Sequence, residues 1–445
     1  MRTIFGILLV VGLAGIGHAD PNGPASSAAA TARERPTGTT PFAVDVYRAR
    51  RAHLMSLLKK GVAAVLSAPE KGTEEKEESL DFFYLTGLWD EPDAALMLIP
   101  ENPPDEREQL LLPSARPESD RWSGYRAILP SLAVEQRIGF RHVRPIGAFG
   151  YFLAMEAQQR KQLDYLGGTV VGYEGEVPKM LDIYGKTSAR QLGVKIEDMH
   201  LILGKMRMVK EPRELEKIQR ATDITVAGHL ESWKRVRPGM HEWELKQIVE
   251  DAFRKGGART LSYPSIVGGG PDGCVLHYPD DDRVIEDGEL VLIDAGAEFD
   301  HYATDVTRTF PANGHFTAEQ RKIYDTVLAA QNAALAKVRP GVTWVELQRA
   351  AEKVISDASY YDYFIHGVGH HVGLYVHDLG SWAQLEPIAE GSVITIEPGI
   401  YIPEKKLGVR IEDTILVTKS GAKLLSGALP RTADEIEKVM KAAKK

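Results

Sequence analysis

The chain has 445 residues, of which 43% are hydrophobic and 26% are charged. This length exceeds what one compact core usually serves, so we expect a globular protein of two domains. The 54 basic and 62 acidic side chains give a formal net charge of −8, which argues against a general binder of nucleic acid or acidic membranes.

The N-terminal segment has the pattern of a secretory signal. Arg2 supplies a positive charge, residues 4–16 are apolar or glycine, and small residues precede Asp20. We therefore expect a signal peptide over residues 1–19 and an exported, periplasmic or secreted protein. The apolar run is shorter than the roughly 20 residues that span a bilayer, so no stable membrane insertion is expected after cleavage. An uncleaved anchor is the alternative.

Residues 20–43 are rich in Ala, Ser and Pro and have no apolar period, which is typical of a linker. A smaller α/β domain is expected over residues 44–205. In it, residues 46–61 have the pattern of an amphipathic helix, and residues 62–69 and 93–100 read as short buried strands.

A second domain is expected over residues 206–440. Pro212 stands where the first turn of a helix tolerates proline. Further helical patterns at residues 242–257, 317–341 and 343–358 alternate with strand-like runs. This alternation predicts an α/β or α+β fold.

The second domain contains a weak internal repeat. Residues 288–299 are followed by 302–310, and residues 391–402 are followed by 408–418. In each half an apolar strand ends in an acid, and a second strand carries another acid. A duplicated half-domain would bring the two hairpins together about a pseudo-twofold axis. The acids are Asp294, Asp305, Glu397 and Glu412.

These acids predict a metal site. Each one alone is more often a solvated or capping residue, but four carboxylates facing one cleft cannot all stay ionised without a cation. Four acids are too many for one small cation, so two metals with bridging carboxylates are the economical interpretation. The segment between the hairpins, HGVGHHVGLYVHD, supplies histidines, although on its own it is also consistent with a glycine-rich binding loop. They are His366, His370, His371 and His377.

The histidine segment is not a zinc-protease helix. His366 and His370 stand four apart, but Gly367 and Gly369 disfavour a helix and no Glu lies between the two histidines. One imidazole added to four carboxylates is an oxygen-rich set, which suits Mn²⁺ or Co²⁺ better than a thiolate site would, with Zn²⁺ an alternative. Cys274, the single cysteine, could act as a nucleophile beside His277, although a lone thiol is more often a small buried hydrophobe.

The motifs IDAG, TDVTRTFP, HGVGHHVGLYVHD, IEPGIY and RIED resemble those of the pita-bread metallopeptidases, in particular the Xaa-Pro aminopeptidase (aminopeptidase P) and prolidase family. SYPSIVGGGPDGCVLHY and FFYLTGLWDEPDAALML are similar to the same group. The resemblance extends over residues 44–440. It implies a C-terminal pita-bread catalytic domain with pseudo-twofold halves and a smaller α/β N-terminal domain.

The resemblance also implies site residues. The family pattern places a ligand at the first position of H-x-x-G, which selects His370 over His371. Arg410 would hold the ligand shell and bind substrate, and Trp122 would contact the proline end of the substrate or a partner subunit. His277, His366 and His377 would line the substrate cleft. Two divalent ions, with Mn²⁺ favoured over Co²⁺ or Zn²⁺, would be held by Asp294, Asp305, His370, Glu397 and Glu412.

The implied activity is hydrolysis of the N-terminal Xaa-Pro bond of proline-containing peptides through a metal-bridging hydroxide. Glu397 would shuttle the proton, and His277 and His377 would donate hydrogen bonds to the substrate carbonyl. Family members are often dimers or tetramers, so a homo-oligomer is expected. The alternatives are a prolidase that cleaves only Xaa-Pro dipeptides, and a catalytically inactive pita-bread protein that binds peptides.

Overall fold

The computed structural model describes residues 40–58, 60–67, 80–89, 91, 93–113, 138–166 and 193–443. The expected signal peptide, residues 20–39 of the expected linker and Trp122 lie outside these ranges. Among the helices that are described, none combines the length and the apolar character needed to cross a membrane.

The first part of the described chain forms a six-stranded mixed sheet in the order β4-β3-β2-β1-β5-β6. β2 runs antiparallel to β1 and β3, and the other neighbours are parallel. The strands are β1 (Val62–Leu66), β2 (Ala95–Leu98), β3 (Glu108–Leu112), β4 (His142–Pro145), β5 (Gln162–Leu166) and β6 (Lys195–Asp198). The helices of this part are α1 (Val44–Leu58), α2 (Leu80–Thr86), α5 (Phe149–Arg160) and α7 (His200–Met208).

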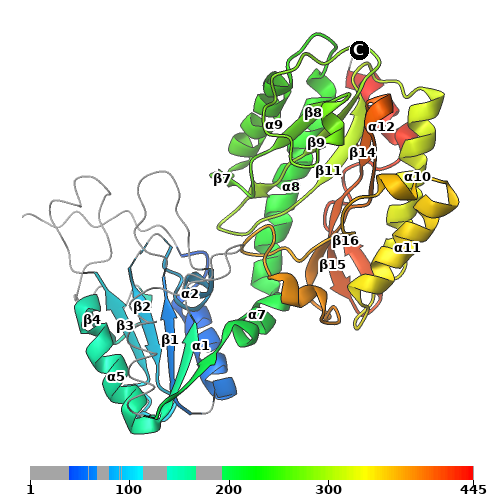
Figure 1. Ribbon diagram of the computed structural model, residues 1–445. Helices are drawn as coiled ribbons and strands as arrows, with labels where there is room; N and C mark the ends of the chain where they lie inside the picture. The colour runs from blue at the N-terminus through cyan, green and yellow to red at the C-terminus, as the bar shows by residue number, and fades with distance from the viewer. Residues whose placement is uncertain are drawn as a thin grey trace, which may run out of the picture. The chain divides into compact units, whose positions relative to one another are not determined.

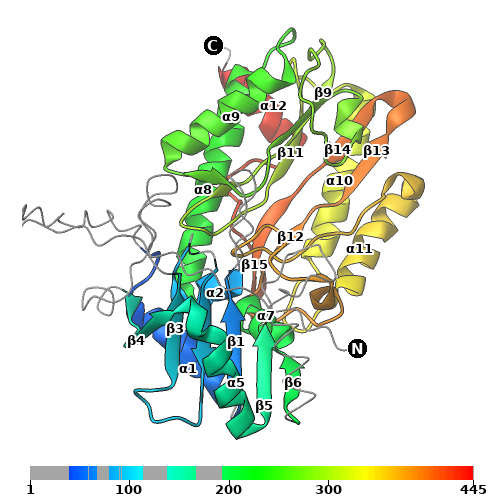
Figure 2. The same cartoon turned by 60° about the vertical axis from the view of Figure 1, so that its left-hand side comes forward.

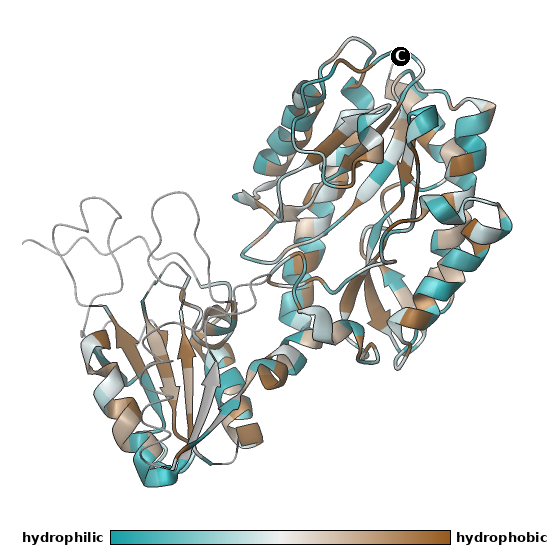
Figure 3. Ribbon diagram, in the orientation of Figure 1, coloured by the Kyte–Doolittle hydropathy of each residue, from teal (hydrophilic) through white to brown (hydrophobic). Residues whose placement is uncertain are grey.

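Apolar side chains cover both faces of this sheet. Successive residues of a strand point to opposite faces, so Ala63 and Val65 pack in one cluster with Phe82, whereas Val62 packs in another with Leu153. Figure 3 shows the central strands in hydrophobic colours. The predicted helix and both predicted strands of this part are confirmed. The helix begins two residues before the sequence pattern and ends three residues before it, and both strands are shorter than their patterns.

The second part begins with a long helix whose first turn carries Pro212, as predicted. Glu211 and Glu214 form a capping box there, which satisfies backbone N–H groups at the helix start. The helices of this part are α8 (Pro212–Arg235), α9 (Glu242–Gly256), α10 (Ala318–Leu335), α11 (Trp344–Asp357) and α12 (Ala433–Ala443). The predicted helix over 317–341 is too long, because the chain leaves the helix after Leu335 and turns through Gly341 at φ 83°.

The strands of the second part fall into two sets. The first set is β7 (Thr260–Leu261), β8 (Ile266–Gly269), β9 (Leu290–Asp294), β10 (Ala297–Glu298) and β11 (Thr307–Pro311). The second set is β12 (Val393–Ile396), β13 (Gly399–Ile402), β14 (Leu407–Arg410), β15 (Asp413–Thr418) and β16 (Gly421–Leu424). Two three-stranded sheets result, with the orders β11-β9-β8 and β12-β15-β16.

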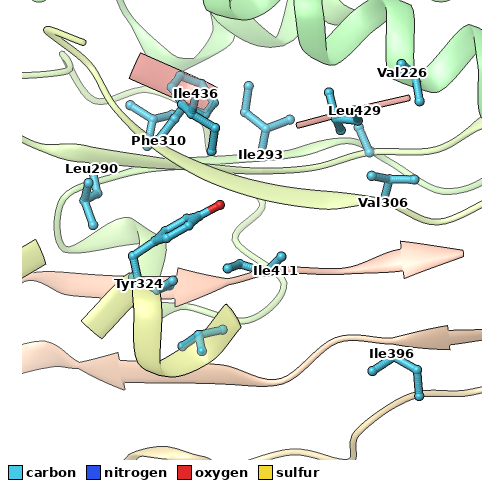
Figure 4. Close-up of a cluster of buried hydrophobic side chains, with 14 of the residues drawn as sticks. Val226, Leu290, Ile293, Val306, Phe310, Tyr324, Ile396, Ile411, Leu429 and Ile436 are labelled. Atoms are coloured by element: carbon cyan, nitrogen blue, oxygen red, sulfur yellow. The ribbon is translucent and has the colours of Figure 1, made fainter. Parts of the chain in front are cut away.

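Each set of strands has its own pair of helices. α8 packs on α9, and these helices contact β10 and β8 respectively; α10 packs on α11 and contacts β12, β13 and β14 (Figures 1 and 2). Figure 4 shows part of the core that joins the sets, with Ile293 from β9, Phe310 from β11, Tyr324 from α10 and Ile436 from α12. The arrangement agrees with the internal repeat expected from the sequence.

The register places the predicted acids with one correction. β9 pairs antiparallel with β11, with Asp294 opposite Thr307, and β12 pairs antiparallel with β15, with Ile396 opposite Asp413. The expectation that each second strand carries its acid is wrong in detail. Asp305 precedes β11 and Glu412 precedes β15, because the backbone pairing of these strands begins only at Thr307 and at Asp413.

Candidate metal centre

The predicted acidic ligands lie next to one another because buried strands of the two three-stranded sheets end beside them. All five residues of β9 are buried, so the apolar stretch Leu290–Ile293 is held in the core and Asp294 emerges at its end. Glu397 stands directly after the fully buried strand β12. The antiparallel pairing with β11 and β15 then returns Asp305 and Glu412 to the same ends of the sheets.

Three of the predicted ligands form a compact group. Asp305, His370 and Glu412 each offer one ligand atom, and these atoms all lie within 4.8 Å of one another. His370 Nε2 is 3.4 Å from Asp305 Oδ2 and also 3.4 Å from Glu397 Oε1. The imidazole therefore lies between carboxylates that come from the two strand sets.

Asp294, the fifth predicted ligand, is connected to this group by a tyrosine. Tyr263 Oη lies 2.5 Å from Asp294 Oδ1 and is also hydrogen-bonded to Asp305 Oδ1. Arg410 Nη2 donates to Asp294 Oδ2 over 2.5 Å. The structure thus brings all five predicted ligands into one connected set.

Sequence reasoning missed Tyr263. The stretch that contains it, SYPSIVGGGPDGCVLHY, is similar to the family, but His277 is the only expected site residue in it. Tyr263 stands 31 positions before Asp294, and no residue spacing indicates that the two side chains meet. The short strands β7 and β8 on either side of it offer no periodic signal.

The electrostatics of the set follow from burial and from like charge. Burial, with the charges of Asp294 and Glu397, raises the pKa of Asp305 well above its ordinary range. Burial, with the charges of Asp305 and Glu397, does the same to the pKa of Glu412. Burial also opposes ionisation of Asp294, but the Arg410 guanidinium and the Tyr263 hydroxyl outweigh it, so the pKa of Asp294 is lowered.

The residues present fit a divalent cation. Glu412 Oε2 accepts a hydrogen bond from Thr307 Oγ1 over 2.7 Å, whereas Glu412 Oε1 is buried and has no hydrogen-bond partner within the described residues. A buried carboxylate oxygen left without a partner is costly, and a cation would relieve that cost. Several carboxylates and one imidazole are also the donor set that hard divalent ions prefer.

The adjacent histidines have different surroundings. The His370 backbone N–H donates to Thr395 Oγ1 over 3.0 Å, and its ring faces the carboxylates. His371 is buried with its ring against Trp344, 5.4 Å between centroids. The structure therefore places His370, and not His371, among the acids.

Arg410 and His366 meet at a tyrosine. Arg410 Nη1 donates to Tyr401 Oη over 2.9 Å, and His366 Nε2 lies 2.8 Å from the same oxygen. Arg410 Nε donates to Thr307 Oγ1 over 3.2 Å. Burial is the main cause that lowers the pKa of His366, so its neutral form is favoured.

His377 lies against the predicted ligand His370, and His277 is near enough to His377 to interact with it electrostatically. The rings of His377 and His370 meet edge to face at 77°, with centroids 4.3 Å apart. Desolvation by the surrounding protein, together with repulsion from His370 and His277, lowers the pKa of His377 to about 4. The ring is therefore neutral near pH 7. Burial raises the pKa of Cys274 to about 11, which disfavours the thiolate that the alternative of a nucleophilic cysteine requires.

Comparisons with known proteins point in one direction. Residues 216–419 match the model of metallopeptidase family M24, and residues 47–164 match that of the aminopeptidase P N-terminal domain. The chain is 36% identical to the Xaa-Pro aminopeptidase of Haemophilus influenzae over 387 residues, 81% of this chain and 87% of that protein.

Two further relatives bear on the choice between activities. The chain is 38% identical to the Xaa-Pro dipeptidase of Pyrococcus furiosus over 259 residues, 58% of this chain and 73% of the dipeptidase. The solved structure of the aminopeptidase PepP of Pseudomonas aeruginosa superposes with a TM-score of 0.80 at 32% identity, with 91% of this chain and 99% of that chain covered.

Proposed function

Because the chain belongs to the M24 metallopeptidases and has the pita-bread fold of aminopeptidase P, we propose that it releases the N-terminal residue from peptides whose second residue is proline. The observation that carries the proposal is the group formed by Asp305, His370 and Glu412 within 4.8 Å. It lies in a chain that spans 87% of a relative named Xaa-Pro aminopeptidase.

We propose that two divalent cations are held by the five residues of the connected set. When bound, such cations lower the pKa of a water molecule and polarise the scissile carbonyl. We propose Mn²⁺ as the physiological ion, because the donors are mainly carboxylates. The ligands are Asp294, Asp305, His370, Glu397 and Glu412.

Glu397 is the carboxylate best suited to move a proton. Its side chain is 17% exposed, compared with 8% for the Asp305 side chain and 11% for that of Asp294, and Glu412 as a whole residue is 1% exposed. A group that takes a proton from water and passes it to the leaving nitrogen must reach the substrate side of the centre. Glu397 fulfils this requirement better than the deeper acids.

The histidines at the rim would bind and orient the peptide. His377 is neutral near pH 7 and can donate one N–H to the substrate carbonyl without adding a charge. His277 would assist at the same carbonyl, and His366, fixed by Tyr401, would line the cleft. The free α-amino group of the peptide would lie among the acids, which restricts cleavage to the first bond.

Proline suits such a site because its nitrogen carries no N–H and its ring fixes φ, so a cleft shaped for the ring gains specificity from rigidity. The second candidate is a dipeptidase restricted to Xaa-Pro. The identity to the archaeal Xaa-Pro dipeptidase supports it, but that similarity covers 58% of this chain, against 81% for the bacterial aminopeptidase.

The decisive experiment uses metal-stripped protein reloaded with Mn²⁺, Co²⁺ or Zn²⁺. It is incubated with an Xaa-Pro dipeptide, an Xaa-Pro-Yaa-Zaa peptide and a matched Xaa-Ala-Yaa-Zaa peptide. Metal-dependent release of the first residue from both proline peptides supports the aminopeptidase, and cleavage of the dipeptide alone supports the dipeptidase. Peptide binding without cleavage under any metal would instead identify an inactive binding protein.

Export and a homo-oligomeric state, a dimer or tetramer, are further proposals. Export rests on the charge and apolar pattern of the first residues, and the oligomer rests on the resemblance to the family. N-terminal sequencing of the protein recovered from the periplasm or medium tests the first. Light scattering of the metal-loaded protein tests the second.

A further inference from the structure

A buried ion cluster holds the residue that follows His377. Asp378 Oδ1 accepts hydrogen bonds from Arg207 Nη2 over 2.6 Å and from the Leu374 backbone N–H over 2.9 Å. Asp378 Oδ2 accepts from Lys210 Nζ over 2.9 Å. The Asp378 and Lys210 side chains are each 1% exposed, so these contacts are shielded from solvent.

The backbone on either side of His377 is tied to the same cluster. Arg207 Nη2 donates to the Asp378 carbonyl oxygen over 2.8 Å, and the Asp378 N–H donates to the His371 carbonyl over 3.0 Å. Gly373 lies against the carboxylate so closely that a Cβ there would be 2.3 Å from Asp378 Oδ2. These contacts close the segment from His371 to Asp378 into a loop, the histidine loop, which carries His377.

The ring of His377 has little support of its own. Within the described part of the chain it makes ring contacts with His370, at 4.3 Å, and with Tyr375, at 6.3 Å, and no hydrogen bond. Its position is therefore set by its backbone, and the backbone is fixed next to it by Asp378. A displacement of Asp378 would move His377 relative to His370.

The cluster reaches beyond the histidine loop. Arg207 Nη1 donates to Asp81 Oδ1 over 2.9 Å, and Asp81 is 2% exposed on α2. α2 lies in the segment that matches the aminopeptidase P N-terminal domain. Arg207 and Lys210 thus balance the charges of Asp81 and Asp378.

The charges of this cluster indicate that it fixes the position of the histidine loop and does not mainly add stability. Buried ion pairs are an inefficient source of stability, because the loss of hydration offsets most of the attraction between the charges. An aspartate that accepts hydrogen bonds from two cations and a backbone N–H is nevertheless held in one position. The backbone of the neighbouring residue is held in one position with it.

We propose that Asp378 is a positioning residue for His377, held in place by Arg207 and Lys210, and that Asp81 extends this hold from α2. The inference rests on the proposed function in one respect, because the catalytic consequence assumes that His377 binds the substrate carbonyl. The structural consequence, a histidine loop held by the cluster, is independent of the activity.

The test compares Asp378→Asn, Arg207→Lys and Asp81→Asn with Glu214→Gln as the matched control. Glu214 is equally buried, pairs with Arg50 at 3.3 Å and accepts a hydrogen bond from Tyr302, and neither of these two contacts involves residues 371–378. Each variant is prepared as full-length, metal-loaded protein. Metal content, kcat and KM for an Xaa-Pro-Yaa-Zaa peptide, and hydrogen–deuterium exchange of peptides that cover residues 366–378 are measured.

We expect Asp378→Asn to lower kcat by about 10- to 100-fold, the effect of misplacing a catalytic group by about 1 Å, with a smaller change in KM and full metal content. Exchange in residues 366–378 should rise selectively. Arg207→Lys and Asp81→Asn should give smaller changes of the same kind, and Glu214→Gln should change neither kcat nor exchange in the loop.

The proposal is overturned if the Asp378 and Arg207 variants keep wild-type kcat and loop exchange, or if Glu214→Gln reproduces their effects. If Asp378→Asn does not fold, Arg207→Lys and Asp81→Asn decide the result. If wild-type protein cleaves no proline peptide, the proposed function fails, and the exchange measurement still decides whether the cluster holds the loop.

Discussion

Arg410 and Asp294 form a buried ion pair in which Arg410 Nη2 lies 2.5 Å from Asp294 Oδ2. The arginine side chain is 4% exposed and the aspartate side chain 11%. The pair leaves Asp294 Oδ1 directed toward Tyr263, so the guanidinium fixes the orientation of a proposed metal ligand. The same guanidinium reaches Tyr401, which connects the orientation of the ligand to His366.

Replacing Arg410 with lysine should therefore weaken metal binding. Lysine keeps the charge but loses the planar fork that contacts Asp294, Tyr401 and Thr307 together. Loss of an outer contact to a ligand typically costs about 10- to 100-fold in metal affinity or activity. Titration of the stripped protein with Mn²⁺ measures the affinity, and Arg237→Lys at an exposed position is the control. Unchanged affinity and kcat/KM in the Arg410 variant would contradict the expectation.

Replacing Glu397 with glutamine should slow the chemical step. Glutamine keeps the shape and can still accept a hydrogen bond from Thr395 Oγ1, which lies 3.3 Å from Glu397 Oε1, but it cannot accept and pass on a proton. General acid–base catalysis contributes about 10²- to 10⁴-fold, so kcat should fall within that range at saturating Mn²⁺. The exposed substitution Glu390→Gln should retain full activity. A kcat within twofold of wild type would assign proton transfer to another group.

The sequence predicted the acids and His370 because these residues stand at the ends of strongly apolar runs or in motifs shared with the family. The buried strands β9 and β12 could be predicted from their runs of apolar residues alone. The exact strand limits were not, and Asp305 and Glu412 lie just outside the strands that were expected to carry them. The local pattern of apolar residues predicts which residues are buried more accurately than it predicts the residue at which backbone pairing begins.

Contacts between distant segments were beyond the sequence. Arg308 is fully buried and pairs with Asp413 at 2.7 Å, although 105 positions separate them. In the sequence, each reads as an ordinary charged residue of a motif. The Arg207–Asp378 pair spans 171 positions in the same way. Such pairs depend on how the strand sets and helices pack against one another, and no periodicity or residue spacing in the sequence predicts that packing.

His229 should make stability depend on pH. It is completely buried, and its Nε2 lies 3.0 Å from the Val306 carbonyl. Burial, with repulsion from Arg308, outweighs attraction from Asp294 and lowers the pKa of His229 from 6.5 to about 4. Below pH 6.5 His229 is protonated in the unfolded chain but stays neutral in the folded protein. The stabilisation present above pH 6.5 is therefore lost as pH falls toward 4.

The size of that loss is about 3 kcal/mol, from about 1.4 kcal/mol for each pH unit between the two pKa values. Urea unfolding of wild type and His229→Gln, both in chelator so that acid cannot act through metal release, measures it. Glutamine can still donate to Val306 but does not titrate. The stability difference between the two proteins should shift by about 3 kcal/mol in favour of the variant between pH 6.5 and pH 4. Parallel curves would contradict the assignment.

Glu412 provides a test in which one substitution has opposite effects with and without metal. Burial and the charges of Asp305 and Glu397 raise its pKa, so folding of the stripped protein must either bury a like charge or take up a proton at this carboxylate. Its Oε1 also lacks a hydrogen-bond partner among the described residues. Glutamine removes the charge while its side-chain oxygen can still accept from Thr307 Oγ1. Stripped Glu412→Gln protein should therefore melt at a higher temperature than stripped wild type.

Metal should reverse that order. A cation at a thousandfold excess over its Kd stabilises a protein by about 4 kcal/mol, and wild type should gain an amount of this size on addition of Mn²⁺. The variant has lost a charged ligand, so its gain should be much smaller and its loaded form should melt below loaded wild type. Thermal melting of both proteins with and without Mn²⁺ gives the four values. If the variant melts lower when stripped and gains as much from Mn²⁺ as wild type does, Glu412 is not a ligand and its burial serves the fold alone.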